Sequence, residues 1–275
     1  MSKKRTPTAD ELESAFEDLK AQLSQTSLGP RKRKDLEGRL QGVVTSLSEL
    51  LDELHPIAHP TSVFDPGNPK IVGRFISLAL IAQERQPLGN IPKFYGSGVY
   101  AIYYKGAFEQ YASISGSETP IYVGKVAPAA HHARTPREQG EKLNSRLGDH
   151  KRSIGKAATT LDLTDFEYRS LVVQSGWEQA AEEYLIHLFQ PLWNSEIGIL
   201  YGFGKHGDSA DTRGNKRSPW DTLHPGRTWA GATKLIDAKT PAMIQQEVAE
   251  HLQVHPAFQT VDDILKSFYD ELKQV

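Results

Sequence analysis

Apolar residues recur at helical spacing through the first part of the chain. Residues 9–24 place Leu12, Phe16, Leu19 and Leu23 at successive spacings of four, three and four, which predicts an amphipathic helix. After Gly29-Pro30, a second apolar stripe runs from Leu36 to Leu54 and predicts a second helix. We therefore expect residues 1–60 to form an N-terminal helical hairpin. Its apolar faces need a partner surface, which is either the rest of this chain or a second copy of it.

The pattern changes in the middle of the chain, where β-branched and aromatic segments alternate with amphipathic ones. Strands are predicted at 98–104, 121–124 and 166–173, and helices at 138–152 and 177–190. This β-β-α-β-α order predicts an α+β fold, in which a small central mixed or antiparallel β-sheet is flanked by helices. We assign residues 90–230 to this core. Residues 231–275 then predict a short helical tail, with helices at 241–253 and 260–272.

Composition narrows the class of protein. The chain has 275 residues, of which 38% are hydrophobic and 24% charged, so it can bury a sizeable core. It contains no cysteine, which excludes disulfides, a thiol nucleophile and Cys-ligated zinc. No apolar run is long enough to span a membrane, and no apolar stretch follows the first charges to make a secretory signal. We expect a cytoplasmic protein without a membrane partner.

The net charge of −2 conceals an uneven distribution along the sequence. Residues 124–160 carry eight Lys and Arg against three acids, whereas residues 161–199 carry one Arg against seven acids. A local basic segment on a near-neutral chain is typical of a surface that binds phosphate. The alternative is a solvated loop that happens to be basic.

Several residues at informative spacing have side chains suited to phosphodiester hydrolysis, which needs a cation, a metal ligand and a base. Arg146 and His150 are one helical turn apart, although a surface pair has the same spacing. Glu182 shares a helix face with apolar residues, so it is either a metal ligand or half of an ion pair. Tyr100 and Tyr122 each lie in a predicted strand, and Asn194 follows the helix that carries Glu182; their structural alternatives are core tyrosines and a turn residue. No HExxH, Walker A, GxGxxG or GxSxG motif is present.

These elements together resemble the GIY-YIG nuclease superfamily. They are Gly98-Val99-Tyr100, Tyr122-Val123-Gly124, the pair Arg146 and His150, and an E-x-x-L-I pattern from Glu182 that leads to Pro191 and Asn194. The resemblance covers 95–198. Residues 202–206 and 218–230 are similar to the segment that follows this core in a subgroup of type II restriction endonucleases, which extends the resemblance to 95–230.

The resemblance implies a role for each of these side chains. Glu182 would bind a single Mg²⁺ ion, and Arg146 would balance charge on the phosphoryl group. Tyr100, near His150, would remove the proton from the attacking water, but which of the two is the base stays open. Tyr122 would contact the scissile phosphate or order the water, Asn194 would brace the site, and Lys125 is a supporting cation.

The resemblance also implies double-stranded DNA as the partner. Base reading would fall to loops 125–145 and 201–228, where the candidates are Arg213, Lys216, Arg217 and Arg227; phosphate positioning is the alternative for each. A palindromic double-strand cut implies a homodimer, to which the N-terminal helices could contribute. The leading hypothesis is a site-specific Mg²⁺-dependent type II restriction endonuclease. Competing hypotheses are a non-catalytic DNA-binding protein on the same fold, a repair or mobile-element GIY-YIG nuclease, and a helical interaction protein built on residues 1–55.

Overall fold

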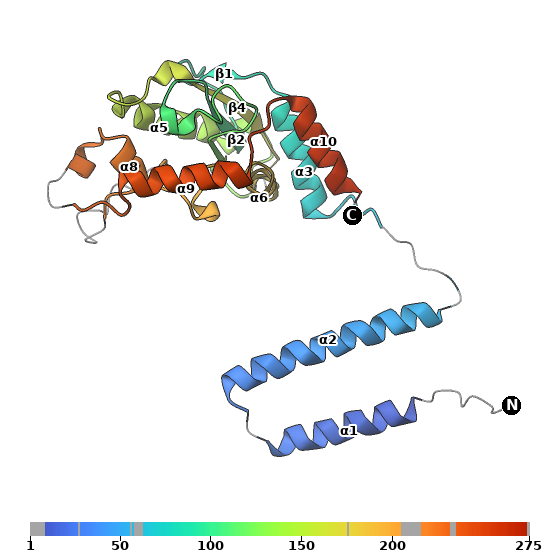
Figure 1. The fold of residues 1–275 in the computed structure, drawn as a ribbon. Coiled ribbons are helices and arrows are strands. Elements are labelled where there is room, and N and C mark those ends of the chain that lie inside the picture. The colour runs from blue at the N-terminus through green and yellow to red at the C-terminus, as the bar shows by residue number, and fades with distance from the viewer. Residues whose placement is uncertain are drawn as a thin grey trace. The chain divides into compact units, whose positions relative to one another are not determined.

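The chain divides into two compact units, residues 1–63 and 64–275. The structure, a computed structural model, describes residues 9–26, 28–55, 57, 63–174, 176–204, 216–231 and 235–273. The first unit contains two helices, α1 (Asp10–Gln25) and α2 (Pro30–Leu54) (Figure 1). Gly29 precedes α2 in an extended conformation and Pro30 opens the helix, a position that proline tolerates because its missing N–H would have no helical partner. The two predicted N-terminal helices are therefore present.

The second unit is built on one sheet, and the predicted α+β fold is confirmed. Within the described residues the sheet has four strands in the order β1-β4-β2-β3, and every neighbouring pair is antiparallel. The strands are β1 (Gln86–Pro87), β2 (Gly98–Tyr104), β3 (Tyr122–Val126) and β4 (Phe166–Val172). Strand β3 lies at one edge of the sheet.

The central strand β2 is buried along its whole length, because helices cover both faces of the sheet. Side chains alternate between the two faces, as the pleat requires. Val99, Ala101 and Tyr103 belong to the apolar cluster formed with α3 (Pro69–Ile81), α6 (Glu178–Phe189) and α10 (Val261–Leu272). Tyr100, Ile102 and Tyr104 belong to the opposite cluster, formed with α5 (Lys142–Lys156) and α9 (Pro241–Val254). In Figure 1, α3 and α10 lie side by side, and an ion pair of 3.3 Å between Arg74 and Glu271 joins them.

Helix α3 and strand β1 were not expected from the sequence. Helix α3 is rich in apolar residues, and β1 has two residues. The remaining short elements connect the larger ones: they are η1 (Glu109–Tyr111), α4 (Pro136–Gln139), η2 (Leu163–Asp165), η3 (Ser195–Ile197), α8 (Pro219–Leu223) and η4 (Thr228–Gly231).

Among the described residues, no helix combines the length and apolar character that crossing a membrane requires.

Candidate active site

Two tyrosines on neighbouring strands form the floor of the candidate site. Tyr100 lies on β2 directly opposite Gly124 on β3, and the rings of Tyr100 and Tyr122 are 6.2 Å apart. Glycine is required at 124, because a Cβ atom there would lie 2.5 Å from the Tyr100 hydroxyl oxygen. The Tyr100 hydroxyl thus occupies the space that a side chain at position 124 would fill.

Helix α5 supplies the next two functional groups. The Tyr100 hydroxyl lies 2.8 Å from Nε2 of His150, and Nε of Arg146 donates to the same hydroxyl at 3.3 Å. The apolar side chains of Leu143 and Leu147 anchor the helix in the core. The one-turn spacing of Arg146 and His150 therefore places both side chains on the face of α5 that meets Tyr100. Their spacing in the sequence predicted the shared helix face.

Burial sets the protonation of these groups. It raises the pKa of Tyr100 well above its ordinary value, with a further contribution from Tyr122. It also lowers the pKa of His150 well below its ordinary value, and the charges of Arg146 and Arg227 add to this effect. Burial raises the pKa of Tyr122 as well, against the opposing influence of Arg146. Near neutral pH the pair is thus a protonated phenol beside a neutral imidazole.

The free edge of β3 is occupied by side chains from α6 and the turn after it. The Asn194 amide accepts from the Val123 N–H and donates to the Val123 carbonyl, both at 3.0 Å. Two residues along, the Lys125 N–H donates to Oε1 of Glu182 at 3.0 Å. Asn194 and Glu182 therefore form hydrogen bonds with backbone groups at the open edge of β3, the strand that carries Tyr122 and Lys125.

Glu182 is held by the Lys125 side chain as well as by its backbone. The Lys125 ammonium lies 2.7 Å from Oε2 of Glu182 and also contacts Gln179. The Glu182 side chain remains 16% exposed, so one carboxylate at the rim of the site is open to solvent. In the described part of the chain, no cluster of three or more His, Cys, Asp or Glu side chains is arranged to hold a metal. A single carboxylate fits Mg²⁺, which completes its shell with water and phosphate oxygens.

Phe203 forms a wall of the site that was not singled out from the sequence. Its ring stacks on Tyr122 at 4.8 Å and lies 5.0 Å from the ring of His150. Phe203 stands between Gly202 and Gly204, and the Arg146 guanidinium would be 3.3 Å from a Cβ at Gly204. An aromatic residue between two glycines was the available signal, because glycines allow a backbone to approach closely.

The four candidates for DNA reading have different environments. Arg213 lies outside the described residues, and Lys216 is exposed. Arg217 is engaged by the protein itself, since it pairs with Asp237 at 2.7 Å and donates to the Ala230 carbonyl at 3.0 Å. Arg227 is only 7% exposed, and its guanidinium contacts the Gly202 and Phe203 carbonyls and Ser153. Some donors of Arg217 and Arg227 therefore have partners within the chain, and the contact of the four residues with base edges stays a prediction.

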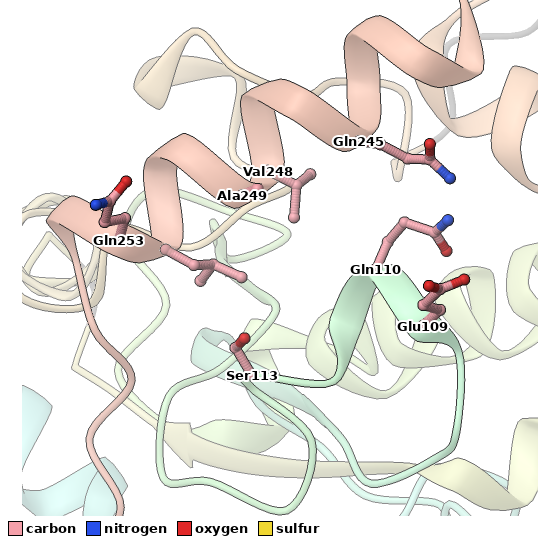
Figure 2. A pocket seen from close by; sticks show the side chains of 8 residues that line it. Glu109, Gln110, Ser113, Gln245, Val248, Ala249 and Gln253 are labelled. Atoms are coloured by element: carbon pink, nitrogen blue, oxygen red, sulfur yellow. The ribbon is translucent and has the colours of Figure 1, made fainter.

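A separate groove lies between η1 and α9 (Figure 2). Its volume is about 540 Å³, and its rim is polar, with Glu109 and Gln110 facing Gln245 of α9. None of the candidate site residues lines it.

Comparison with known families places the site within a known domain. Residues 92–252 match the family model described as the Eco29kI GIY-YIG domain. The matched segment contains the whole cluster from Tyr100 to Arg227 and most of helix α9. A search of curated proteins finds no match to the chain.

Proposed function

Since the chain belongs to the Eco29kI GIY-YIG domain family, a family of type II restriction endonucleases, we propose that it hydrolyses phosphodiester bonds of double-stranded DNA at a specific palindromic site with Mg²⁺. The observation that carries this proposal is the junction of Tyr100, His150 and Arg146 at a single phenol oxygen. Glu182 lies at the neighbouring edge of β3, where its carboxylate accepts from the Lys125 N–H. A base, a cation and a metal ligand are thus gathered around one sheet edge.

Tyr100 and His150 act as a pair in the proton transfer. Arg146 donates to the Tyr100 oxygen, so the phenol proton is free to point toward Nε2 of His150. When water approaches, Tyr100 takes the water proton at its oxygen and passes its own proton to His150. A phenol with a raised pKa needs such an acceptor, because the phenolate alone is scarce near neutral pH. The neutral imidazole of His150 provides it.

Arg146 and Tyr122 contact the phosphate. A fixed guanidinium beside a developing phosphoryl charge stabilises the transition state by about 3 kcal/mol, if it resembles an oxyanion-hole donor. Phe203 covers one side of Tyr122 and His150 and limits the access of water to both rings. Asn194 holds the β3 backbone from which Tyr122 projects.

Glu182 is the protein ligand proposed for Mg²⁺. The ion would supply positive charge to the phosphate during cleavage. Lys125 balances the charge of Glu182, at 2.7 Å from its Oε2.

The N-terminal hairpin is proposed as the contact of a homodimer. Large apolar side chains on both helices are exposed, among them Phe16 at 60% and Leu54 at 72%. An uncovered apolar surface of this kind marks an interaction site. Helix α1 begins with Asp10, Glu11 and Glu13, whereas α2 carries Lys32, Arg33 and Lys34 in its first turns. A two-fold axis that sets the acidic start of α1 against the basic start of the partner's α2 makes the charges complementary.

Cleavage of a long unmethylated DNA in Mg²⁺ tests the proposal. The variant Glu182→Gln removes the proposed ligand, and Glu183→Gln is its matched control on the same helix. Glu183 is exposed and bonds Gln179 rather than β3. We expect discrete fragments from the wild type and from Glu183→Gln, and intact DNA with Glu182→Gln or EDTA. The fragment ends then give the recognition site.

Other outcomes point to the competing hypotheses. Intact DNA with retained binding would assign the chain to non-catalytic DNA-binding proteins on this fold. A smear of random sizes that disappears in EDTA would keep the chemistry and reject site-specific restriction. Cleavage by Glu182→Gln equal to the wild type would reject Glu182 as the metal ligand.

A further inference from the structure

Arg227 is a buried cation that joins three parts of the chain. Its Nη1 donates to the Gly202 carbonyl at 2.7 Å and its Nη2 to the Phe203 carbonyl at 3.1 Å. Nη2 also contacts the hydroxyl of Ser153 on α5, one turn beyond His150. One planar guanidinium thus ties the 202–203 segment to the helix that carries the candidate catalytic residues.

The segment around Arg227 is shaped to place this guanidinium. Gly226 has φ +151°, and a Cβ there would lie 1.7 Å from the Lys156 carbonyl at the end of α5. Only glycine lets the chain pass so close to the helix. Asp221, on α8, lies 3.5 Å from Nη1 of Arg227 and accepts from the Ser218 hydroxyl at 2.5 Å. A buried charge with an acidic neighbour and carbonyl partners is compensated in place.

The same contacts fix the position of Phe203. Gly202 has φ +101°, and a Cβ there would lie 2.3 Å from the Ser218 hydroxyl, so the backbone is pressed against the start of α8. The Trp220 ring meets Phe203 edge-on at 4.8 Å. Phe203 therefore contacts α8 as well as the rings of Tyr122 and His150.

We propose that Arg227 is a positioning residue for the proposed nuclease reaction, which acts by clamping Phe203 against Tyr122 and His150 rather than by reading DNA. The segment 218–227 then has a role in positioning the site and not in base recognition. The kinetic test of this proposal rests on the proposed function, because it needs a nuclease activity to measure. The spectroscopic test needs only the folded protein.

The kinetic test separates the clamp from DNA reading. We expect Arg227→Lys, which keeps the charge but loses the planar fork, to lower kcat by about 10²-fold, the scale of an active-site displacement of about 1 Å. Phe203→Leu should do the same. The Kd for uncut DNA in EDTA should stay within about twofold, and the salt dependence of binding should not change, since no phosphate contact is lost. A raised Kd with unchanged kcat, a salt slope lower by about 1, or relaxed site choice would overturn the clamp in favour of DNA reading.

Matched variants separate positioning from folding. Arg169 is also 7% exposed and binds a carboxylate and a carbonyl, but on the opposite side of the sheet, through Glu118 and Gln83. Arg169→Lys should therefore lower stability without the loss in kcat. If Arg227→Met fails to fold because Asp221 loses its contact with Arg227, Arg227→Met with Asp221→Asn removes both charges. Wild-type kcat in a folded variant of either kind would reject the proposal.

A spectroscopic readout does not depend on activity. We expect the Phe203 ring, 5.0 Å from the His150 ring, to shift the His150 imidazole proton resonances, and Phe203→Leu defines the loss of that shift. We expect Arg227→Lys to lose most of it. If the wild type cuts no DNA, the proposed function is rejected. The His150 spectrum still tests whether Arg227 positions Phe203. An unchanged His150 spectrum in Arg227→Lys would reject it.

Discussion

The Tyr100 hydroxyl lies 2.8 Å from Nε2 of His150, so a strand side chain and a helix side chain share one proton position. Both groups are buried, and water is not needed to join them. Removing the hydroxyl is therefore the smallest change that separates the two roles left open by the sequence.

Tyr100→Phe should abolish most cleavage, by about 10²–10⁴-fold, the usual range for a lost acid–base group. The protein should stay folded, because the ring that fills the core is kept. Single-turnover cleavage is the measurement. Tyr103→Phe is the control: its hydroxyl accepts from Arg169 at 3.1 Å in the opposite cluster. Equal activity losses in the two variants would assign the effect to packing.

Gly124→Ala should disrupt the site by a steric clash, without removing any functional group. The new methyl group would lie 2.5 Å from the Tyr100 oxygen, so the ring must move and the bond to His150 must break. We expect a loss of about 1–3 kcal/mol in the free energy of unfolding together with the activity. Gly155→Ala is the control, since a Cβ there meets nothing within 4 Å; it should raise stability by up to about 1 kcal/mol and leave cleavage intact. Wild-type cleavage by Gly124→Ala would contradict the geometry.

Two buried histidines should make the fold acid-sensitive. Burial, with Arg227 nearby, lowers the pKa of His224 to about 3, and the pKa of His150 is also well below its ordinary value. The unfolded chain binds protons at these positions below about pH 6.5, while the folded chain does not. The unfolded state then binds more protons, so stability falls as the pH drops from about 6.5.

Chemical denaturation between pH 7.5 and 5 measures this slope. Each histidine should contribute about 1.4 kcal/mol per pH unit below its unfolded pKa. His224→Gln should remove one such contribution, although it also loses the bonds to Tyr111 and Thr160. A flat wild-type profile down to pH 5 would contradict the prediction.

Asn194→Ala should be costly for an uncharged substitution. The side chain is 2% exposed, and its amide bonds both backbone groups of Val123. Removing it leaves a buried N–H and a buried carbonyl without partners, which costs about 2–4 kcal/mol in the free energy of unfolding. Denaturant titration measures the loss. A change below about 0.5 kcal/mol, the level of an ordinary surface substitution, would show that water replaces the amide.

Phe16→Ser combined with Leu54→Ser should convert the proposed dimer into monomers, because both side chains are exposed apolar groups of the hairpin. Sedimentation at several protein concentrations measures the equilibrium. Gln41→Ser, at an exposed polar position of α2, is the control. High salt should weaken the dimer, since charge complementarity is screened. A wild type that stays monomeric at all concentrations tested would reject the hairpin as the contact.

Local patterns in the sequence were sufficient for the fold class and for the order of the elements. The β-branched and aromatic run at 98–104 predicted β2, and the one-turn spacing of Arg146 and His150 predicted a shared helix face. The set of candidate site residues came from the resemblance, since local patterns left a structural alternative for each residue. The family match bears out that resemblance but does not test the role of any single residue.

Arg227 shows what local patterns miss. A charged residue after a glycine in a loop reads as exposed, yet its partners Gly202 and Phe203 lie 25 and 24 residues away. The pairing of Lys125 with Glu182 spans 57 residues. Helix α3 was missed for another reason, because apolar residues dominate its sequence.

The side chains on the free edge of β3 have a consequence for the behaviour of the protein in solution. An edge strand with open N–H and carbonyl groups is a template for strand addition and aggregation. Asn194 takes both groups of Val123 and Glu182 takes the Lys125 N–H, so the edge next to Tyr122 is closed to a foreign strand. The same two residues that shape the candidate site therefore also act as gatekeepers against edge-to-edge association. Substitution of either residue should therefore lower the solubility of the protein as well as its activity.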